Sequence, residues 1–210
     1  MKSGKLGFTS LVMSAAVFCA AAAPQLALAT PVVYGFESFN DLDMVTSLVG
    51  GLTFSNTTVI QAGASLNEFE FPPRSGMNVV FDNGGPITID FASPVFSVGG
   101  YFNYVAGLSF SAYDSANGLL GTDVSDFAIN TALSGDVGST PNEFLNFSSA
   151  SGLIARVVIT GGDPLGASFT LDDLTVDAGT AIPEPQTLAL VLGLLGAGCL
   201  PGGWIRRRAR

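Results

Sequence analysis

Two adjacent carboxylates, Asp172 and Asp173, interrupt an apolar stretch near the end of the chain. In residues 168–176, SFTLDDLTV, the apolar positions before Asp172 and those after Asp173 each follow the two-residue period of a strand. Leu171 and Leu174, however, are three positions apart. If all these apolar side chains face one core, the strand needs one extra residue at Asp172 and Asp173, which is a β-bulge. Such a bulge would direct carboxylates toward the edge of the sheet.

The same stretch resembles the last strand of carbohydrate-binding jelly rolls. The resemblance implies a structural calcium ion, held by one carboxylate near the first strand and one in the last. The matching positions here are Glu37 and Asp172. Calcium takes six to eight oxygen ligands, so Glu37, Asp172 and Asp173 are candidate ligands, with backbone carbonyls supplying others. The alternative is that these residues are solvated and discourage pairing between sheet edges.

The residue types also limit catalysis. The chain has no histidine, and its two cysteines, Cys19 and Cys199, lie in the terminal segments. Nucleophile systems of the Ser-His and Cys-His kinds are therefore excluded from the middle of the chain, as are histidine-ligated zinc sites. A hydrolase that uses two carboxylates stays open. No pair of carboxylates is marked for that role, so we expect no enzyme, no catalytic residue and no cofactor other than calcium.

One aromatic residue is a candidate for contact with a glycan. By strand alternation, Tyr101 and Asn103 share a face with Ser97, whereas Phe102 and Tyr104 share the opposite face with Val98. Phe102 is then predicted in the core, and Tyr101 is predicted to be accessible for stacking on a sugar. The alternative is that Tyr101 is an ordinary amphipathic residue of a sheet.

The segments that must position these residues read as short strands. Residues 87–91 alternate between apolar and polar types, and residues 82–86, DNGGP, form a turn-rich cluster after residues 78–81, which predicts a hairpin. Residues 153–160 are apolar on both faces, as in a central strand. Further strands are expected at residues 33–36, 52–54, 95–104 with a bulge at Gly99 and Gly100, 108–113, 127–131, 143–147 and 168–176. The fold prediction is all-β: an antiparallel β-sandwich that is jelly-roll-like.

The net charge of this domain limits the classes of molecule that it can bind. Between residues 30 and 182 there are two arginines and sixteen carboxylates, a formal net charge of −14. Nucleic acid is not expected as a partner because phosphate binding needs a basic surface. Divalent cations and neutral sugars remain. One of the two cations, Arg74, is expected to pair with a carboxylate, and residues 114–118, DSANG, are expected to form an ordinary turn rather than a calcium loop.

Both termini carry targeting patterns. Residues 1–29 combine Lys2 and Lys5 with an apolar stretch and a small-residue cleavage site, which predicts a secretory signal peptide. Residues 187–205 are uncharged, and nineteen residues of helix would span roughly 28 Å, close to the thickness of a bilayer core. Arg206, Arg207, Arg208 and Arg210 follow as a basic cytoplasmic flank that sets topology.

The C-terminal segment as a whole resembles the PEP-CTERM sorting signal of Gram-negative bacteria. The resemblance is carried by Pro183, Glu184 and Pro185, the apolar run and the closing arginines. It implies that an exosortase recognises the Pro-Glu-Pro motif, cuts the protein from its membrane anchor and passes it to the cell envelope or extracellular matrix. The alternative is a permanent single-span anchor. The predicted order is a signal peptide (1–29), an exported domain (30–178), a linker (179–186), a transmembrane helix (187–205) and a basic tail (206–210).

These patterns predict an exported, non-catalytic β-sandwich for structure, adhesion or association with exopolysaccharide. Two alternatives stay open, a carbohydrate-binding module with a specific glycan ligand and a carboxylate-based glycoside hydrolase. The expected partners are the exosortase, the membrane before processing, and exopolysaccharide.

Overall fold

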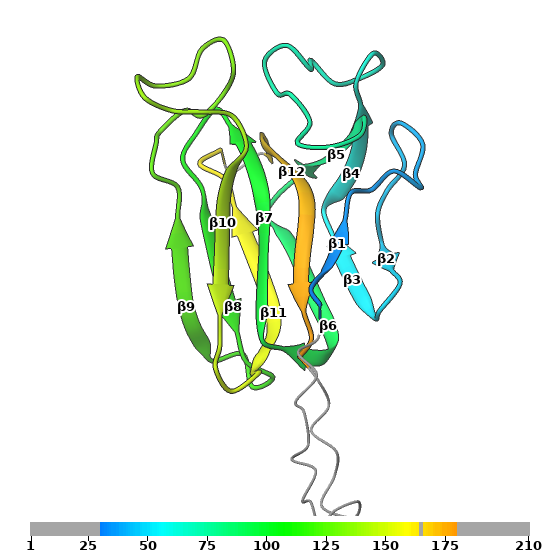
Figure 1. Cartoon of the computed structure of the whole chain (residues 1–210), viewed down its shortest axis with the longest axis vertical. Helices are drawn as coiled ribbons and strands as arrows, with labels where there is room; N and C mark the ends of the chain where they lie inside the picture. Colours follow the sequence, from blue (N-terminus) through cyan, green and yellow to red (C-terminus); the bar gives the residue numbers. More distant parts are fainter. Residues whose placement is uncertain (1–29, 164–165, 180–210) are drawn as a thin grey trace, which may run out of the picture.

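A computed structural model of the chain describes residues 30–163 and 166–179, and these residues form two antiparallel sheets packed face to face (Figure 1). Sheet A has the order β10 (Glu143–Ser148), β7 (Ser97–Tyr104), β12 (Gly166–Asp177), β5 (Asn78–Asn83) and β4 (Thr57–Gln61), and β1 (Val32–Tyr34) also pairs with β12. Sheet B has the order β2 (Ser47–Leu48), β3 (Leu52–Ser55), β6 (Ile87–Val95), β11 (Ile154–Thr160), β8 (Ser109–Tyr113) and β9 (Leu119–Val124). The predicted antiparallel β-sandwich is confirmed.

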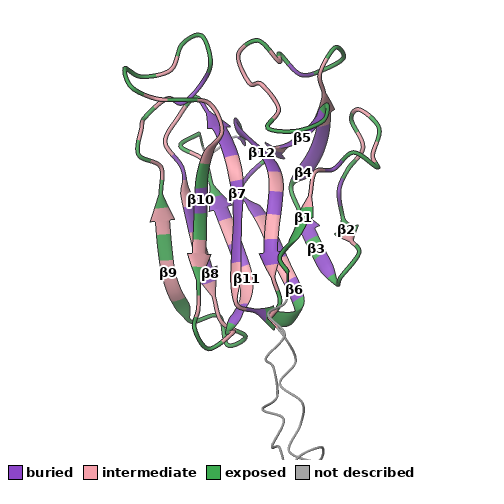
Figure 2. Cartoon of the chain, in the orientation of Figure 1, coloured by how far each residue is buried: buried purple, intermediate pink, exposed green. Residues whose placement is uncertain are grey.

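The core lies between the inner faces of the two sheets, where the strands are buried (Figure 2). Phe102 of β7 and Phe110 of β8 meet edge to face across the two sheets, with ring centroids 6.2 Å apart. Leu171 of β12 and Val157 of β11 are fully buried in the same core. β11 pairs with β6 on one side and β8 on the other, which confirms that this apolar segment is a central strand.

The predicted hairpin of residues 78–81 and 87–91 is wrong. β5 belongs to sheet A and β6 to sheet B, because β4 and β12 occupy the two edges of β5 and leave none for β6. Gly84 and Gly85 have φ of 85° and 147°, and they turn the chain from one sheet to the other. The crossing is fixed by Asn56, whose carbonyl accepts a hydrogen bond from the Asn83 amide (2.9 Å).

Two further strand predictions are also corrected. Residues 95–104 are not one strand, because the chain crosses from sheet B to sheet A at Phe96, and the paired register of β7 with β10 runs through Gly99 and Gly100 without a bulge. Residues 127–131 are irregular apart from one bridge, between Tyr104 and Asn130. The carboxylate of Asp136 accepts hydrogen bonds from two amides of that segment, so the loop closes on itself instead of extending a sheet.

A buried carboxylate shapes the start of β12. Asp82 of β5 is 1% exposed and accepts hydrogen bonds from the amides of Ser168 (2.9 Å) and Phe169 (3.2 Å) and from the Ser168 hydroxyl (3.0 Å). The register between β5 and β12 shifts between Gly166 and Thr170, so these amides have lost their partners in the sheet. Asp82 supplies the acceptors that they would otherwise lack.

Replacing Asp82 with alanine should destabilise the domain by about 1–3 kcal/mol, because the buried amides of Ser168 and Phe169 lose their acceptor. Denaturant unfolding of the purified protein measures this. The exposed substitution Asp126→Ala is the control, and it should change stability by less than about 0.5 kcal/mol. Equal stability of Asp82→Ala and wild type would contradict the proposed role of Asp82.

Candidate functional site

The outer face of sheet A brings together the residues that the sequence marks for chemistry. Tyr101 of β7 is paired in register with Asp172 of β12 on one side and with Phe144 of β10 on the other. Residues directly opposite each other on neighbouring strands face the same side of a sheet. The three side chains therefore form a row on the outer face.

The predicted bulge in β12 is confirmed. Asp172 pairs with Tyr101 and Thr175 pairs with Gly99, so three steps along β12 oppose two steps along β7. The extra residue bends the backbone, and Asp173 has a φ of 46°. As a result Leu171 and Leu174 both face the core, as the sequence pattern requires.

The two bulge carboxylates hold the loop between β4 and β5 against the sheet. Asp172 Oδ2 accepts hydrogen bonds from the amides of Arg74 (2.8 Å) and Ser75 (2.9 Å). Asp173 Oδ1 accepts one from the Ser75 hydroxyl (2.7 Å). Nearby, the Pro72 carbonyl accepts hydrogen bonds from the side-chain amide of Asn103 (3.0 Å). The loop is thus fixed on the outer face at two points.

Glu37 holds the far end of the same loop. Its Oε1 accepts hydrogen bonds from the amides of Met77 (3.1 Å) and Asn78 (2.9 Å). Gly76 has a φ of 55°, and a Cβ there would overlap the Glu37 carboxylate. Glycine is therefore required where the loop passes Glu37. The structure brings Glu37, Asp172 and Asp173 to one loop, residues 74–78, although they are distant in sequence.

Asp172 is the carboxyl whose titration is most affected by this arrangement. Its side chain is 2% exposed, and burial raises the pKa of Asp172 to about 6. The amide hydrogen bonds from Ser75, Asp173 and Arg74 oppose that rise, while the negative charge of Asp173 adds to it. A carboxylate at this position is stable at neutral pH because backbone amides replace the water that burial removes.

The calcium site stays a prediction from the sequence. Within residues 30–163 and 166–179, no group of three or more His, Cys, Asp or Glu side chains is arranged to hold a metal ion. Both oxygens of Asp172 accept backbone amides, Oδ1 from Asp173 (2.7 Å). The oxygens that would bind calcium have hydrogen-bond donors instead, which is a poor fit to a cation site.

An aromatic pair lies beside the loop on β7 and β10. The rings of Tyr101 and Phe144 are 4.9 Å apart between centroids and tilted by 46°. Phe144 is 43% exposed, so the pair presents aromatic surface to solvent. Gly99 permits this packing, since a Cβ there would lie 2.7 Å from Phe144 Cζ. Tyr101 lies on the outer face as predicted, with Phe102 in the core.

Phe144 was not singled out from the sequence, although alternation could have found it. In residues 143–147, EFLNF, the buried Leu145 fixes the inner face, which places Phe144 and Asn146 on the outer one. The missing information was that β10 lies directly next to Tyr101. That neighbour relation depends on strand order, which sequence alternation does not give.

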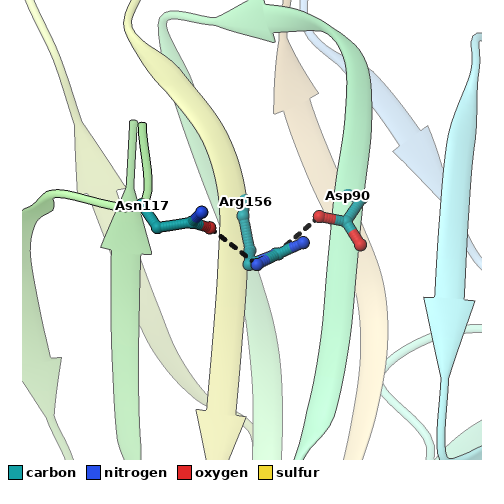
Figure 3. Close-up of polar contacts among 3 residues, drawn as sticks. All are labelled: Asp90, Asn117 and Arg156. Carbon is teal, nitrogen blue, oxygen red and sulfur yellow. Dashed lines mark hydrogen bonds and ion pairs between the residues drawn. The ribbon is translucent and has the colours of Figure 1, made fainter. Parts of the chain in front are cut away.

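The prediction that Arg74 pairs with a carboxylate is not what the structure shows. The Arg74 guanidinium lies over the ring of Tyr101, 4.6 Å from its centroid, in a cation–π contact. The ion pair in the described part of the chain joins Arg156 Nε to Asp90 Oδ1 (2.6 Å) on sheet B (Figure 3). Arg156 also donates to Asn117 Oδ1 (2.8 Å), so it links β6, β11 and the turn after β8.

The segment from Asp114 to Gly118 is an ordinary turn, as predicted. Asp114 Oδ1 accepts hydrogen bonds from the amides of Ala116 (2.9 Å) and Gly118 (2.7 Å), and the segment joins β8 to β9.

Several predicted features lie outside the described residues. These are the signal peptide (1–29), the Pro183, Glu184 and Pro185 motif, the apolar segment 187–205 and the arginines Arg206, Arg207, Arg208 and Arg210. In the described part of the chain no helix has the length and apolar character to cross a bilayer.

Comparison with known proteins gives similar folds. No family model matches the chain, and no curated protein matches it significantly. The cleaved adhesin domain K2 of Lys-gingipain is 11% identical, with 70% of this chain and 97% of that chain covered and a TM-score of 0.44.

Two carbohydrate-binding modules are also similar in fold. TmCBM61, solved in complex with β-1,4-galactotriose, is 10% identical, with coverage of 61% and 91% and a TM-score of 0.36. The CBM22-1 xylan-binding domain of Paenibacillus barcinonensis Xyn10C is 14% identical, with coverage of 63% and 88% and a TM-score of 0.34.

Replacing Asp172 with asparagine should change how stability depends on pH. The folded pKa of about 6 lies above the value of about 3.9 for aspartate in an unfolded chain. The contribution of Asp172 to the free energy of unfolding is therefore largest below about pH 4 and falls as the pH rises through 6. Between these values the difference between wild type and Asp172→Asn should change by up to about 2 kcal/mol, measured by denaturant unfolding.

The control is Asp126→Asn, an exposed substitution that leaves Asp172 and its hydrogen-bond partners in place and should keep the pH dependence. The series is run with calcium and with a chelator, because bound calcium would keep Asp172 ionised and raise the midpoint. Parallel pH curves for wild type and Asp172→Asn would contradict the raised pKa, and a midpoint that depends on calcium would favour the metal site.

Proposed function

We propose that this domain is a non-catalytic, exported β-sandwich that associates with neutral extracellular polysaccharide through the outer face of sheet A. The observation that carries the proposal is the aromatic pair of Tyr101, which is partly buried, and Phe144, which is 43% exposed. Ligand sites combine apolar or aromatic surface with a few placed polar groups. Here the Arg74 guanidinium lies at one side of the pair, and the exposed Asn146 lies two residues from Phe144 on the same face.

Charge favours a neutral glycan over an anionic one. The domain carries a formal net charge of −14 between residues 30 and 182, so an anionic polymer would be repelled. Arg74 does not reverse this, because one guanidinium is set against Asp172 and Asp173 beneath the same loop. A neutral polysaccharide avoids the repulsion and can still accept hydrogen bonds from Arg74.

We propose no catalytic role for the carboxylates near the aromatic pair. Glu37 and Asp172 hold the loop beside the aromatic pair, and Glu37 Oε1 and both Asp172 oxygens accept hydrogen bonds from backbone amides. A general acid or nucleophile needs an oxygen that can reach a substrate. These carboxylates therefore serve the loop, and binding rather than hydrolysis is the function proposed.

Delivery forms a second part of the proposal. The signal peptide (1–29) directs export, and the helix 187–205 with its arginines arrests it. The exosortase then recognises Pro183, Glu184 and Pro185 and releases the domain to the envelope or matrix. In Figure 1, β1 begins and β12 ends at the same end of the sandwich, and Val32 pairs with Val176. Both connections to the targeting segments thus leave from one end.

Replacing Tyr101 or Phe144 with alanine should weaken retention on a neutral extracellular polysaccharide by about tenfold each, because an aromatic contact contributes about 0.5–1.5 kcal/mol beyond burial. Affinity electrophoresis or a glycan array measures the loss. The control is Tyr113→Ala, which removes a half-buried tyrosine from sheet B and should leave retention unchanged. If both Tyr101→Ala and Phe144→Ala are retained on the polysaccharide as strongly as wild type, the proposal is contradicted.

Mass spectrometry of the mature protein tests the delivery route. We expect an N-terminus near Thr30 and a C-terminus near Pro183 in cells that contain an exosortase. Substitution of Pro183, Glu184 and Pro185 by alanine should leave residues 187–210 attached. An intact C-terminus in the unsubstituted protein would instead indicate a permanent anchor.

A further inference from the structure

We infer that a second site on sheet A binds a small neutral ligand built around an apolar ring system. The site is a pocket of about 310 Å³ on the opposite side of the β4–β5 loop from the aromatic pair. Ile60 of β4, Phe81 of β5 and Thr170 of β12 form its floor, and Leu66 and Phe71 of the loop form its cover.

The floor consists of residues that face outward from the sheet. Phe81 is paired directly with Thr170, while its neighbour Val80 is paired with Leu171 and points into the core. Ile60 is paired with Val79 and lies on the same outer face. Ile60, Phe71 and Phe81 remain half-buried, so apolar surface is left open within the pocket.

The cover is fixed by hydrogen bonds, so the pocket is formed before any ligand binds. The Ser65 hydroxyl donates to Asp41 Oδ2 (2.6 Å), and the Leu66 amide donates to the Gln61 carbonyl (3.1 Å). The Phe71 amide donates to the Asn67 carbonyl (2.9 Å). When a ligand enters a preformed pocket, no conformational entropy is lost in ordering its walls.

Size and lining define the ligand class. A cavity of about 150 Å³ lined by apolar side chains holds benzene, so about 310 Å³ suits a molecule of roughly twice that volume. The aromatic side chains of Phe71 and Phe81, which are partly exposed, favour a ring that packs against their faces and edges. Ser65, Asn67 and Thr170 add a few hydroxyl and amide groups, enough to orient one polar substituent.

Charge excludes the common ionic alternatives. The residues that line the pocket are uncharged, and the surrounding domain is strongly acidic. A carboxylate ligand such as a fatty acid would meet no cation in the lining and would be repelled by the domain. A cation would find no carboxylate in the lining to replace its hydration. The ligand that matches this environment is neutral.

This inference does not rest on the proposed polysaccharide binding. Residues 72–75 of the loop lie between the pocket and Tyr101, since Phe71 lines the pocket while Arg74 covers the Tyr101 ring. The two sites therefore use different residues, and each can be removed without the other.

The test uses 2-naphthol, a neutral two-ring fluorescent probe, and full-length protein reconstituted in nanodiscs. We expect saturable binding beyond that of empty nanodiscs. Thr170→Phe places a ring in the pocket and should weaken binding at least about tenfold. The matched control is Thr175→Phe, which adds the same ring to the same strand outside the pocket and should bind like wild type.

Asn67→Trp provides a second blocking variant at the rim, in case Thr170→Phe does not fold, and near-UV circular dichroism checks folding. Tyr101→Ala should leave 2-naphthol binding unchanged. The inference is overturned if wild type shows no saturable binding, or if a folded blocking variant binds as well as wild type. It is also overturned if a neutral monosaccharide displaces the probe, since the pocket would then belong to the glycan site.

Discussion

The β-bulge at Asp172 and Asp173 is the constraint on which the outer face of sheet A depends. Without the extra residue, either Leu171 or Leu174 would leave the core. With it, two carboxylates lie under the β4–β5 loop, where they accept hydrogen bonds from Arg74 and Ser75. The position of that loop then determines the two surfaces beside it. Arg74 is placed over Tyr101 on one side, and Phe71 closes the pocket on the other.

The loop between β4 and β5 and the carboxylates of β12 are stable together because each supplies the hydrogen-bond partners that the other lacks. Pro72 and Pro73 cannot donate backbone hydrogen bonds, so this part of the chain cannot continue a sheet. The amides that follow the prolines would be left without partners against the sheet, and a buried unpaired amide costs about 1–3 kcal/mol. A buried Asp172 without donors would be costlier still. Each group removes the penalty of the other, which explains a carboxylate on a face where water is largely excluded.

Local pattern was enough to predict the sandwich, the central strand β11 and the bulge, because each depends on which face a side chain occupies. It failed where strand pairing decided the outcome. The sequence of residues 78–91 is typical of a hairpin. Because β4 and β12 pair with the two edges of β5, however, β6 pairs in the other sheet. The strands β4 and β9 were missed because Thr57–Gln61 and Leu119–Val124 lie beside turns and show weak alternation. Phe144 was missed for the same reason as the hairpin, since its importance comes from the neighbouring strand.

The ends of the described chain and two long loops lie at opposite ends of the sandwich. β1 begins and β12 ends at one end of the sandwich, whereas the loops at residues 62–77 and 125–142 lie at the other (Figure 1). These loops brace each other, because the Glu70 carbonyl accepts a hydrogen bond from Ala132 (2.9 Å) and Glu70 Oε1 accepts one from Ser134 (3.1 Å). The loop that covers the outer face is thus supported from within the domain. Because β12 ends at Asp177, at the far end of the sandwich from this loop (Figure 1), we expect the proposed cleavage near Pro183 to leave the contacts of Tyr101 and Phe71 intact.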